Sequence, residues 1–349
     1  MSLFFLASKL SLANQGSDRS RIAKGKNAAV RFTPITHSCM HAIEIQGFSK
    51  NYAVGFWKKQ LQPALRSLNL TVEAGETFGF LGPNGAGKTT TLKLLLGITF
   101  PTAGSAKILG KDFRDPEVKS RIGFLPEQPY FYDYLSAPEL LDYYAQLSGV
   151  PAAGRAQRIQ ELLQRVGLGD VRNKHLRKFS KGMLQRVGIA QAIVHDPEVI
   201  FLDEPMSGLD PLGRHEVREL IQGLKDAGRT IFFSTHILSD AEALCDRVAV
   251  IHKGELRGVG VVNDLRSSSA DKVEVIWQGA KALPALAGHV PESHVTGDTV
   301  RATISAEDLD LVLEKLRQER ARLTSVTPLR GTLEEYFLAK TSGTGEERA

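Results

Sequence analysis

The stretch GPNGAGKTT, at Gly82–Thr90, constrains the fold of this chain more than any other feature. It matches the pattern G-x-x-x-x-G-K-[ST]. It follows the apolar run TFGFL, which predicts a buried strand, and it precedes TTTLKLLLG, which predicts a helix. Glycines in such a loop let successive N–H groups point at one anion, and the helix that follows adds its positive end. The sequence therefore predicts a phosphate site and not a chance glycine-rich turn.

Lys88 and Thr89 supply the side-chain chemistry of this loop. The ammonium of Lys88 can reach the β- and γ-phosphates of a nucleotide, and the hydroxyl of Thr89 can bind Mg²⁺. The nucleotide-binding residues expected in the loop are Gly82, Pro83, Asn84, Gly85, Ala86, Gly87, Lys88, Thr89 and Thr90.

Two further predicted strands end in polar residues that suit the same reaction. In VIFLDEP, four apolar residues predict a buried strand, so Asp203 emerges at the end where the phosphate loop also lies. Its carboxylate suits Mg²⁺, usually through water. Glu204 is the right type of group to orient and deprotonate a water for attack on the γ-phosphate. TIFFSTH ends in His236, which can hydrogen-bond the γ-phosphate from the same crevice.

Short apolar runs alternate with helical patterns from Ala42 to about Val262, which predicts an α/β domain with a largely parallel sheet. After the polar break Ser267–Lys272, the runs VEVIW and VRATI predict strands, and a helical pattern lies between VRATI and the C-terminal residues. We therefore expect three parts: a nucleotide-binding domain at 40–265, a small α+β domain at 270–340 and a disordered tail at 341–349.

Positive charge is concentrated at the N-terminus. Residues 1–39 carry six Lys and Arg against one Asp, so this stretch accounts for the whole net charge of +5. We expect a disordered basic extension there, with a membrane-surface or targeting role as the alternative. The near-neutral remainder argues against nucleic-acid binding. The two cysteines, Cys39 and Cys245, form no disulfide framework or metal spacing, and no apolar run approaches the roughly 18 residues that span a bilayer.

Six elements in order resemble the nucleotide-binding subunit of ATP-binding cassette (ABC) transporters. The resemblance covers about Ile43 to Val262, and its elements are the Lys88 loop, LPEQP with Gln128, FSKGMLQR, VIFLDEP, SGLD ending at Asp210, and His236. It implies a P-loop ABC ATPase core with an antiparallel β subdomain and a helical subdomain at about 129–195. It also implies ATP and Mg²⁺ as cofactors.

The stretch RKFSKGMLQRVGIAQA contains what looks like a second phosphate-binding turn. In the family, this signature turn binds the γ-phosphate of the nucleotide that the other subunit holds. The resemblance therefore implies that Ser180 and Gly182 serve a partner's ATP, so that hydrolysis needs a head-to-tail homodimer with two-fold symmetry. Ser180 fits the N-cap of the helix whose first N–H groups would close around that phosphate.

The signature departs from the usual LSGGQ, because Lys181 and Met183 replace Gly and Gln. Such variants resemble the single-cassette subunits that pair with separate membrane subunits of the ABC-2 exporter type. Lys181 either adds positive charge near the sandwiched γ-phosphate or points to solvent. Two unit charges about 4 Å apart gain about 1 kcal/mol in water and about 4 kcal/mol at an effective dielectric near 20, so this charge matters only if the closed dimer excludes water.

The resemblance also assigns residues outside the phosphate loop. Tyr52 is the aromatic that stacks on adenine, with Phe56 or Trp57 as alternatives. Gln128 contacts the metal and the attacking water, and Asp210 belongs to the nucleotide site. Four aromatics either form a groove for a cytoplasmic helix of a membrane partner or pack the helical subdomain: Tyr130, Phe131, Tyr132 and Tyr134.

These expectations favour a transport ATPase. ATP-driven dimer closure and hydrolysis would power substrate movement by integral-membrane permease subunits, with export favoured, at the cytoplasmic face of the inner (plasma) membrane. A cassette ATPase acting on DNA or the ribosome fits less well, because 92 positions between Lys88 and Ser180 leave no room for a long coiled coil, and the chain has one cassette. A small-molecule kinase does not explain Ser180, Gly182 and His236. The C-terminal domain could regulate turnover, dimerise or recognise cargo.

Overall fold

The computed structural model describes residues 41–55, 60–267, 272–279, 286, 290, 292–329 and 333–342. The expected basic extension and the alternative adenine-stacking residues, Phe56 and Trp57, lie outside these residues. The last helix runs to Ser342, two residues into the expected disordered tail, and the rest of that tail, 343–349, lies outside the described residues. No helix in the described part is both long and apolar enough to span a membrane.

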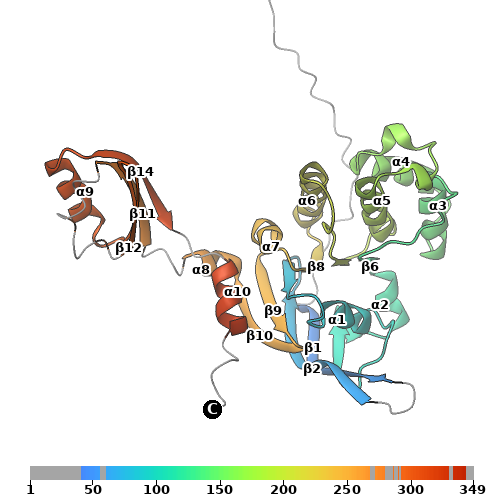
Figure 1. Ribbon diagram of the computed structural model, residues 1–349. Helices are drawn as coiled ribbons and strands as arrows, with labels where there is room; N and C mark the ends of the chain where they lie inside the picture. The colour runs from blue at the N-terminus through green and yellow to red at the C-terminus, as the bar shows by residue number, and fades with distance from the viewer. Residues whose placement is uncertain are drawn as a thin grey trace, which may run out of the picture.

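A six-stranded sheet of order β10-β9-β3-β8-β7-β6 forms the centre of the molecule (Figure 1). Five of its strands are parallel: β3 (Thr77–Leu81), β6 (Ile122–Leu125), β7 (Val199–Asp203), β8 (Thr230–Thr235) and β9 (Arg247–His252). β10 (Glu255–Val261) runs antiparallel to β9. Every residue of β3, β7 and β8 is buried, which explains their continuous apolar runs. The carboxyl ends of these three neighbouring strands therefore meet at one edge, where ligands bind in open α/β sheets.

A second, antiparallel sheet covers one side of this core. Its order is β2-β1-β4-β5, with β1 (His41–Val54), β2 (Gln60–Glu73), β4 (Ala103–Ile108) and β5 (Lys111–Asp112). Its apolar face packs with α1 (Lys88–Leu95) and with β3 in a single hydrophobic cluster. α2 (Pro116–Ser120) leads from this sheet back to β6. The antiparallel β subdomain implied by the family resemblance is confirmed.

The helical subdomain inserts between β6 and β7. It contains α3 (Ala137–Leu147), α4 (Arg155–Arg165) and α5 (Lys181–Ile193), with 3₁₀ turns at Gly169–Val171 and Leu176–Lys178. These helices share a hydrophobic cluster of their own. α6 (Pro211–Asp226), α7 (Leu238–Leu244) and α8 (Val262–Ser267) complete the cassette. Figure 1 shows the helical subdomain beside the central sheet, opposite the strands β9 and β10.

A third sheet forms most of the C-terminal region. Its order is β12-β13-β11-β14, all antiparallel, with β11 (Lys272–Gln278), β12 (Glu292–Thr296), β13 (Thr299–Ser305) and β14 (Arg322–Leu329). α9 (Leu309–Gln318) buries Val312 and Leu316 against the face of the sheet that carries Trp277. Alternate residues of β11 are buried, as one-sided coverage requires.

The last helix, α10 (Leu333–Ser342), does not join that sheet. It returns to the cassette and contacts α7, α8, β9 and β10. The N–H of Leu333 donates to Glu242 Oε1 at 2.7 Å, and Leu333 itself is buried in the cluster under β8. Tyr336 lies over Gly258, where an added Cβ would be 2.5 Å from the tyrosine oxygen. Leu333, Tyr336 and Phe337 have helical i, i+3, i+4 spacing, so one apolar stripe docks on the cassette.

Candidate active site

The loop Gly82–Gly87 joins β3 to α1 at the carboxyl edge of the central sheet. Gly87 is the N-cap of α1 with φ of 111°, a conformation that side chains disfavour. A Cβ at Gly82 would lie 2.4 Å from the carbonyl oxygen of Ile251. Gly87 is thus required by backbone conformation and Gly82 by the close approach of a neighbouring strand.

The ammonium of Lys88 is folded back on its own loop. Its Nζ donates to the carbonyls of Gly82 at 2.7 Å and Pro83 at 3.2 Å, and it lies 3.2 Å from Glu204 Oε1. Both side chains are buried, so their charges attract each other in a poorly screened environment. A phosphate group entering the loop would offer Lys88 a competing anionic partner and would release Glu204.

Asp203, at the end of β7, is held by two hydroxyl groups. Ser234 Oγ donates to its Oδ1 at 2.6 Å, and Thr89 Oγ1 lies 3.4 Å from the same oxygen. Burial raises the pKa of the Asp203 carboxyl above its ordinary value, although these hydrogen bonds act in the opposite direction. The carboxylate and the Thr89 hydroxyl together present hard oxygen ligands.

Glu204 and His236 form a pair beside Lys88. His236 Nδ1 lies 2.9 Å from Glu204 Oε2, and the N–H of Glu204 donates to the carbonyl and the hydroxyl of Ser234, each at 3.2 Å. Glu204 has a φ of 47°, in the left-handed region that a non-glycine residue seldom adopts. Such strain persists only where neighbours impose it, and it often marks functional sites.

Lys88, Glu204 and His236 line one cavity of about 340 Å³, whereas Asp203 does not line it. Its lining residues are Ala64, Asn84, Gly85, Gly87, Lys88, Thr89, Thr90, Glu127, Glu204, Ser207 and His236. Loop N–H groups and an ammonium can hold a polyphosphate there. The carboxylate and the imidazole can orient a water beside it.

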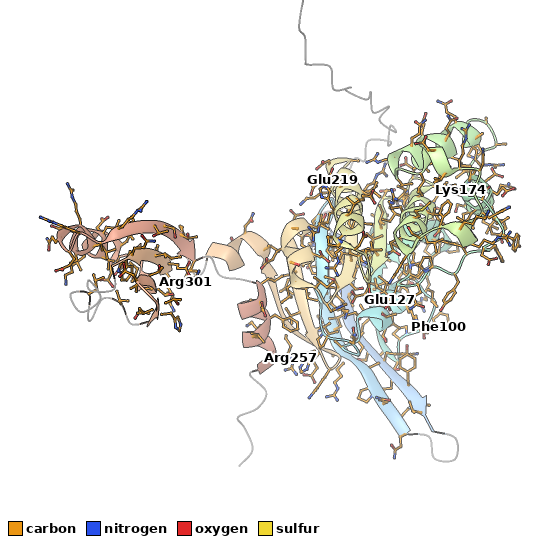
Figure 2. All side chains as sticks on the ribbon, turned by 45° about the horizontal axis from the view of Figure 1, so that its top comes forward. Phe100, Glu127, Lys174, Glu219, Arg257 and Arg301 are labelled. Atoms are coloured by element: carbon orange, nitrogen blue, oxygen red, sulfur yellow. The ribbon has the colours of Figure 1, made fainter. Side chains whose placement is uncertain are left out.

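Several residues assigned from the family resemblance lie outside this lining. Gln128 accepts a hydrogen bond from the hydroxyl of Tyr130 at 3.1 Å, while its neighbour Glu127 faces the cavity and is labelled in Figure 2. Tyr52 is 38% exposed on β1, with Lys50 Nζ 5.2 Å from its ring centre. Asp210 is the N-cap of α6 and accepts from the N–H of Gly213 at 3.1 Å.

The signature turn is also separate from the cavity. Ser180 is the N-cap of α5, and its exposed hydroxyl accepts from the N–H of Met183 at 3.3 Å. Lys181 is exposed, as one of the two alternatives expected, and it does not line the cavity. Its side chain crosses Gly208, where an added Cβ would lie 2.1 Å from the Lys181 ammonium. Gly182 follows on the same helical turn.

Sequence reasoning did not single out Ser234, Ser207, Glu127 and Ala64. Ser234 would have been the easiest of these to predict, because it stands two positions before His236 in TIFFSTH. Its contact with Asp203 depends on β7 pairing with β8 in the register that sets Asp203 opposite Ser234. Strand order and register decide that contact, and neither follows from the local pattern of either strand.

The raised pKa of Asp203 predicts that the carboxylate needed for ATP hydrolysis lowers the stability of the folded chain. The pKa of the Asp203 carboxyl is higher in the folded chain than in the unfolded chain. Such a carboxyl stabilises the fold at pH values below its unfolded pKa, and this stabilisation is lost as pH rises through its folded pKa. Ionised Asp203 therefore destabilises the ATP-free fold at neutral pH. We expect Asp203→Asn to raise the unfolding free energy by about 0.5–2 kcal/mol at pH 7.5 in chelator, with a smaller gain at pH 5 and with loss of ATP hydrolysis.

Thermal unfolding at both pH values tests this prediction. Asp226→Asn, on the exposed end of α6, is the matched control and should change little. An Asp203→Asn variant less stable than the parent at neutral pH would show that the buried carboxylate stabilises the fold.

Comparisons with known proteins agree with this geometry. The sequence profile of the ABC transporter family matches residues 65–207. An ABC transporter ATP-binding protein of Synechocystis sp. is 43% identical over 93% of this chain and 90% of its own length. The daunorubicin resistance ATP-binding protein DrrA3 of Streptomyces coeruleorubidus is 34% identical over 88% of this chain and 97% of its own length.

A solved structure extends the agreement to the fold. A dimeric ATP-binding cassette in a post-hydrolysis state, bound to ADP and phosphate, has a TM-score of 0.57 and is 25% identical; the match covers 63% of this chain and 98% of the other. The cassette core, the cavity at its phosphate loop and the relatives therefore lead to one conclusion: the chain belongs to the ATP-binding subunits of ABC transporters, which are ATPases.

Proposed function

We propose that this chain hydrolyses ATP for an exporter, as a homodimer bound to ABC-2 type permease subunits at the cytoplasmic face of the plasma membrane. One observation carries the proposal: the phosphate loop at Lys88 and the signature turn at Ser180 do not meet within one chain. The cavity at Lys88 has acid, base and ammonium groups, while Ser180 is exposed at the start of α5 outside that cavity. Two copies arranged head to tail would complete two sites.

Each residue has a role in this proposal. The loop N–H groups and Lys88 bind the β- and γ-phosphates. Glu204 takes the proton of the attacking water, and His236 hydrogen-bonds the γ-phosphate and, through Nδ1, positions Glu204. Ser180 and Gly182 bind the γ-phosphate of the partner subunit's nucleotide, and Asp210 belongs to the same interface.

Asp203 and Thr89 fit a Mg²⁺ ion. Their oxygen atoms lie 3.4 Å apart on neighbouring elements, and the described residues contain no cluster of three or more His, Cys, Asp or Glu that would hold a metal by itself. Mg²⁺ bound with few protein ligands is typical where phosphate oxygens and water complete the shell, and there it neutralises phosphate charge. Gln128 and Tyr52 would join the metal and the adenine respectively only once nucleotide is bound.

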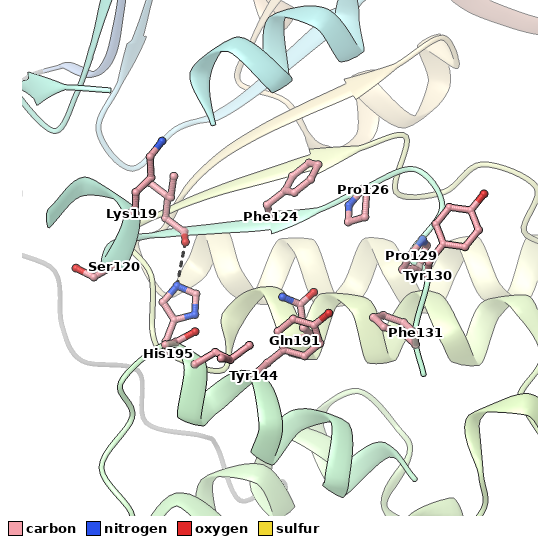
Figure 3. A pocket seen from close by; sticks show the side chains of 13 residues that line it. Lys119, Ser120, Phe124, Pro126, Pro129, Tyr130, Phe131, Tyr144, Gln191 and His195 are labelled. Atoms are coloured by element: carbon pink, nitrogen blue, oxygen red, sulfur yellow. Dashed lines mark hydrogen bonds between the residues drawn. The ribbon is translucent and has the colours of Figure 1, made fainter. Parts of the chain in front are cut away.

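A groove between the central sheet and the helical subdomain is an observation in favour of a permease partner. It has a volume of about 540 Å³ and lies between β6 on one side and α3 and α5 on the other (Figure 3). Tyr130, 88% exposed, and Leu147, 65% exposed, stand at this groove. His195 also lines the groove, and its Nε2 lies 2.9 Å from the carbonyl oxygen of Ile122.

The four aromatics of the sequence have different positions. Phe131 packs against the core of the helical subdomain, although it also touches the groove. Tyr132 and Tyr134 are exposed and contact each other, with ring centres 5.9 Å apart. Tyr130 is thus the aromatic best placed to anchor a cytoplasmic helix of the permease.

Export is supported by one relative whose name refers to daunorubicin resistance. Resistance to a drug is consistent with outward movement, and that relative matches 88% of this chain. The chain has the accessory sheet β11–β14 and the cassette in one polypeptide, and both would act in the assembled exporter.

Sedimentation with membranes tests the docking groove. We expect Tyr130→Ala to weaken binding to membrane vesicles from cells that produce the chain by about 30-fold, because a buried interface tyrosine contributes about 2 kcal/mol.

Tyr134→Ala is the matched control, since this tyrosine is exposed outside the groove lining. Vesicles treated with protease should lose binding if the partner is a permease. Equal binding by Tyr130→Ala, or binding that survives proteolysis, would contradict docking of a protein at this groove.

A further inference from the structure

Helix α5 contacts the segment that follows Glu204 at Pro205 and at Gly208. Gln185, only 4% exposed, lies on the face of α5 that points toward this segment. Its Nε2 donates to the carbonyl of Pro205 at 2.8 Å. Pro205 is the residue after Glu204, so this contact lies one peptide away from the proposed base.

The first turn of α5 contacts the other end of the same segment. The side chain of Lys181 crosses Gly208, whose φ of +66° and lack of a Cβ leave room for it. The N–H of Ser207 donates to the carbonyl of Glu204 at 3.0 Å and closes the turn between these contacts.

Backbone chemistry explains why an amide side chain stands at Gln185. β7 ends at Asp203, so the carbonyl of Pro205 has no strand partner from β7 pairing, and a buried carbonyl without a donor is unfavourable. The primary amide of Gln185 supplies that donor. A fixed Pro205 carbonyl in turn restrains the left-handed backbone of Glu204.

We propose that Gln185 is a positioning residue for ATP hydrolysis, joining α5 to Glu204 so that the two move together. This inference rests on the proposed roles of Ser180 and Glu204. The partner's γ-phosphate would bind at the N-terminus of α5, and α5 would then hold Glu204 in place for the nucleotide of its own subunit. Binding of ATP at the partner's site would thereby fix the position of Glu204 at the site of its own subunit.

Gln185→Met tests the proposal, because methionine keeps the unbranched length and removes the donor. We expect kcat for ATP to fall by about 10- to 100-fold, the range for a catalytic group displaced by up to an ångström. The Michaelis constant should stay within about twofold, since Gln185 does not line the cavity. Gln222→Leu removes an exposed glutamine on α6 and serves as the control with unchanged kcat.

Two further measurements separate positioning from general damage. In a Glu204→Gln background, Gln185→Met should give no additional loss of turnover; a second loss of the same factor would overturn the inference. Gln185→Glu keeps the shape but donates only when protonated, so its kcat relative to the parent should recover as pH falls from 8 to 6. A flat ratio across that range would also overturn it.

Glu204→Gln by itself distinguishes a failure of the proposed catalytic role of Glu204 from a failure of the positioning role of Gln185. If Glu204→Gln hydrolyses ATP normally, the proposed role of Glu204 fails and this inference fails with it. If Glu204→Gln is inactive while Gln185→Met has a normal kcat, only the positioning role of Gln185 is overturned.

Discussion

Glu204→Gln is expected to lower ATP turnover by about 10²- to 10⁴-fold, the usual contribution of a general base, while ATP still binds. Glutamine keeps the size of the side chain and can still contact His236, which lies 2.9 Å from the carboxylate. It cannot accept the proton of the attacking water. It also removes a negative charge that Lys88 now contacts at 3.2 Å, so Lys88 becomes free for phosphate.

Two measurements check this variant. Phosphate release reports turnover, and light scattering with ATP reports the dimer, which should accumulate because nucleotide remains uncleaved. Glu219→Gln, on the exposed face of α6 and labelled in Figure 2, is the control for loss of one surface carboxylate. Normal turnover in Glu204→Gln would remove Glu204 from catalysis.

A mixture of two inactive variants is expected to regain activity. Lys88→Ala removes the ammonium that binds phosphate in the phosphate loop. Ser180→Glu places a negative charge in the signature turn, where the partner's phosphate would bind. Each change alone leaves every site of a homodimer defective, with losses of about 10²- to 10³-fold typical for a removed phosphate or oxyanion contact. The helix itself should tolerate Ser180→Glu, because a carboxylate at a helix N-terminus is favourable.

In a one-to-one mixture, half of the dimers are mixed, and each mixed dimer has one intact site. The rate should therefore recover to about a quarter of the parent rate if the two sites act independently, and to less if occupancy of the defective site is needed to position Glu204 at the intact one. Co-expression with two affinity tags isolates the mixed dimer and removes any dependence on subunit exchange. No recovery in the purified mixed dimer, or full activity of either single variant, would contradict the shared-site arrangement.

The central part of the site follows from local sequence. The strand, loop and helix around Lys88 are adjacent in the chain, so their glycines and apolar runs predict both the fold and the anion site. Asp203 and His236 could be placed at the same sheet edge because both follow apolar strands. Parallel strands bring such ends together whatever their order, which is why the pattern suffices.

Contacts between distant segments could not be read in this way. Ser234 meets Asp203 only because β7 and β8 are neighbours in one register. Gln185 reaches Pro205 because α5 packs against the end of β7, and Lys181 crosses Gly208 for the same reason. The return of α10 to the cassette likewise depends on a complementary surface at α7 and β10.

By itself, then, the sequence determined the parallel α/β cassette, its phosphate loop and the residue types at the strand ends, because helix and strand periods and glycine stereochemistry act over neighbouring residues. The tertiary structure decided the Lys88–Glu204 contact, the support of Asp203 by Ser234 and the attachment of α5 to the segment after Glu204. Those features depend on strand order, register and packing, and free energy of packing is shared among residues far apart in the chain.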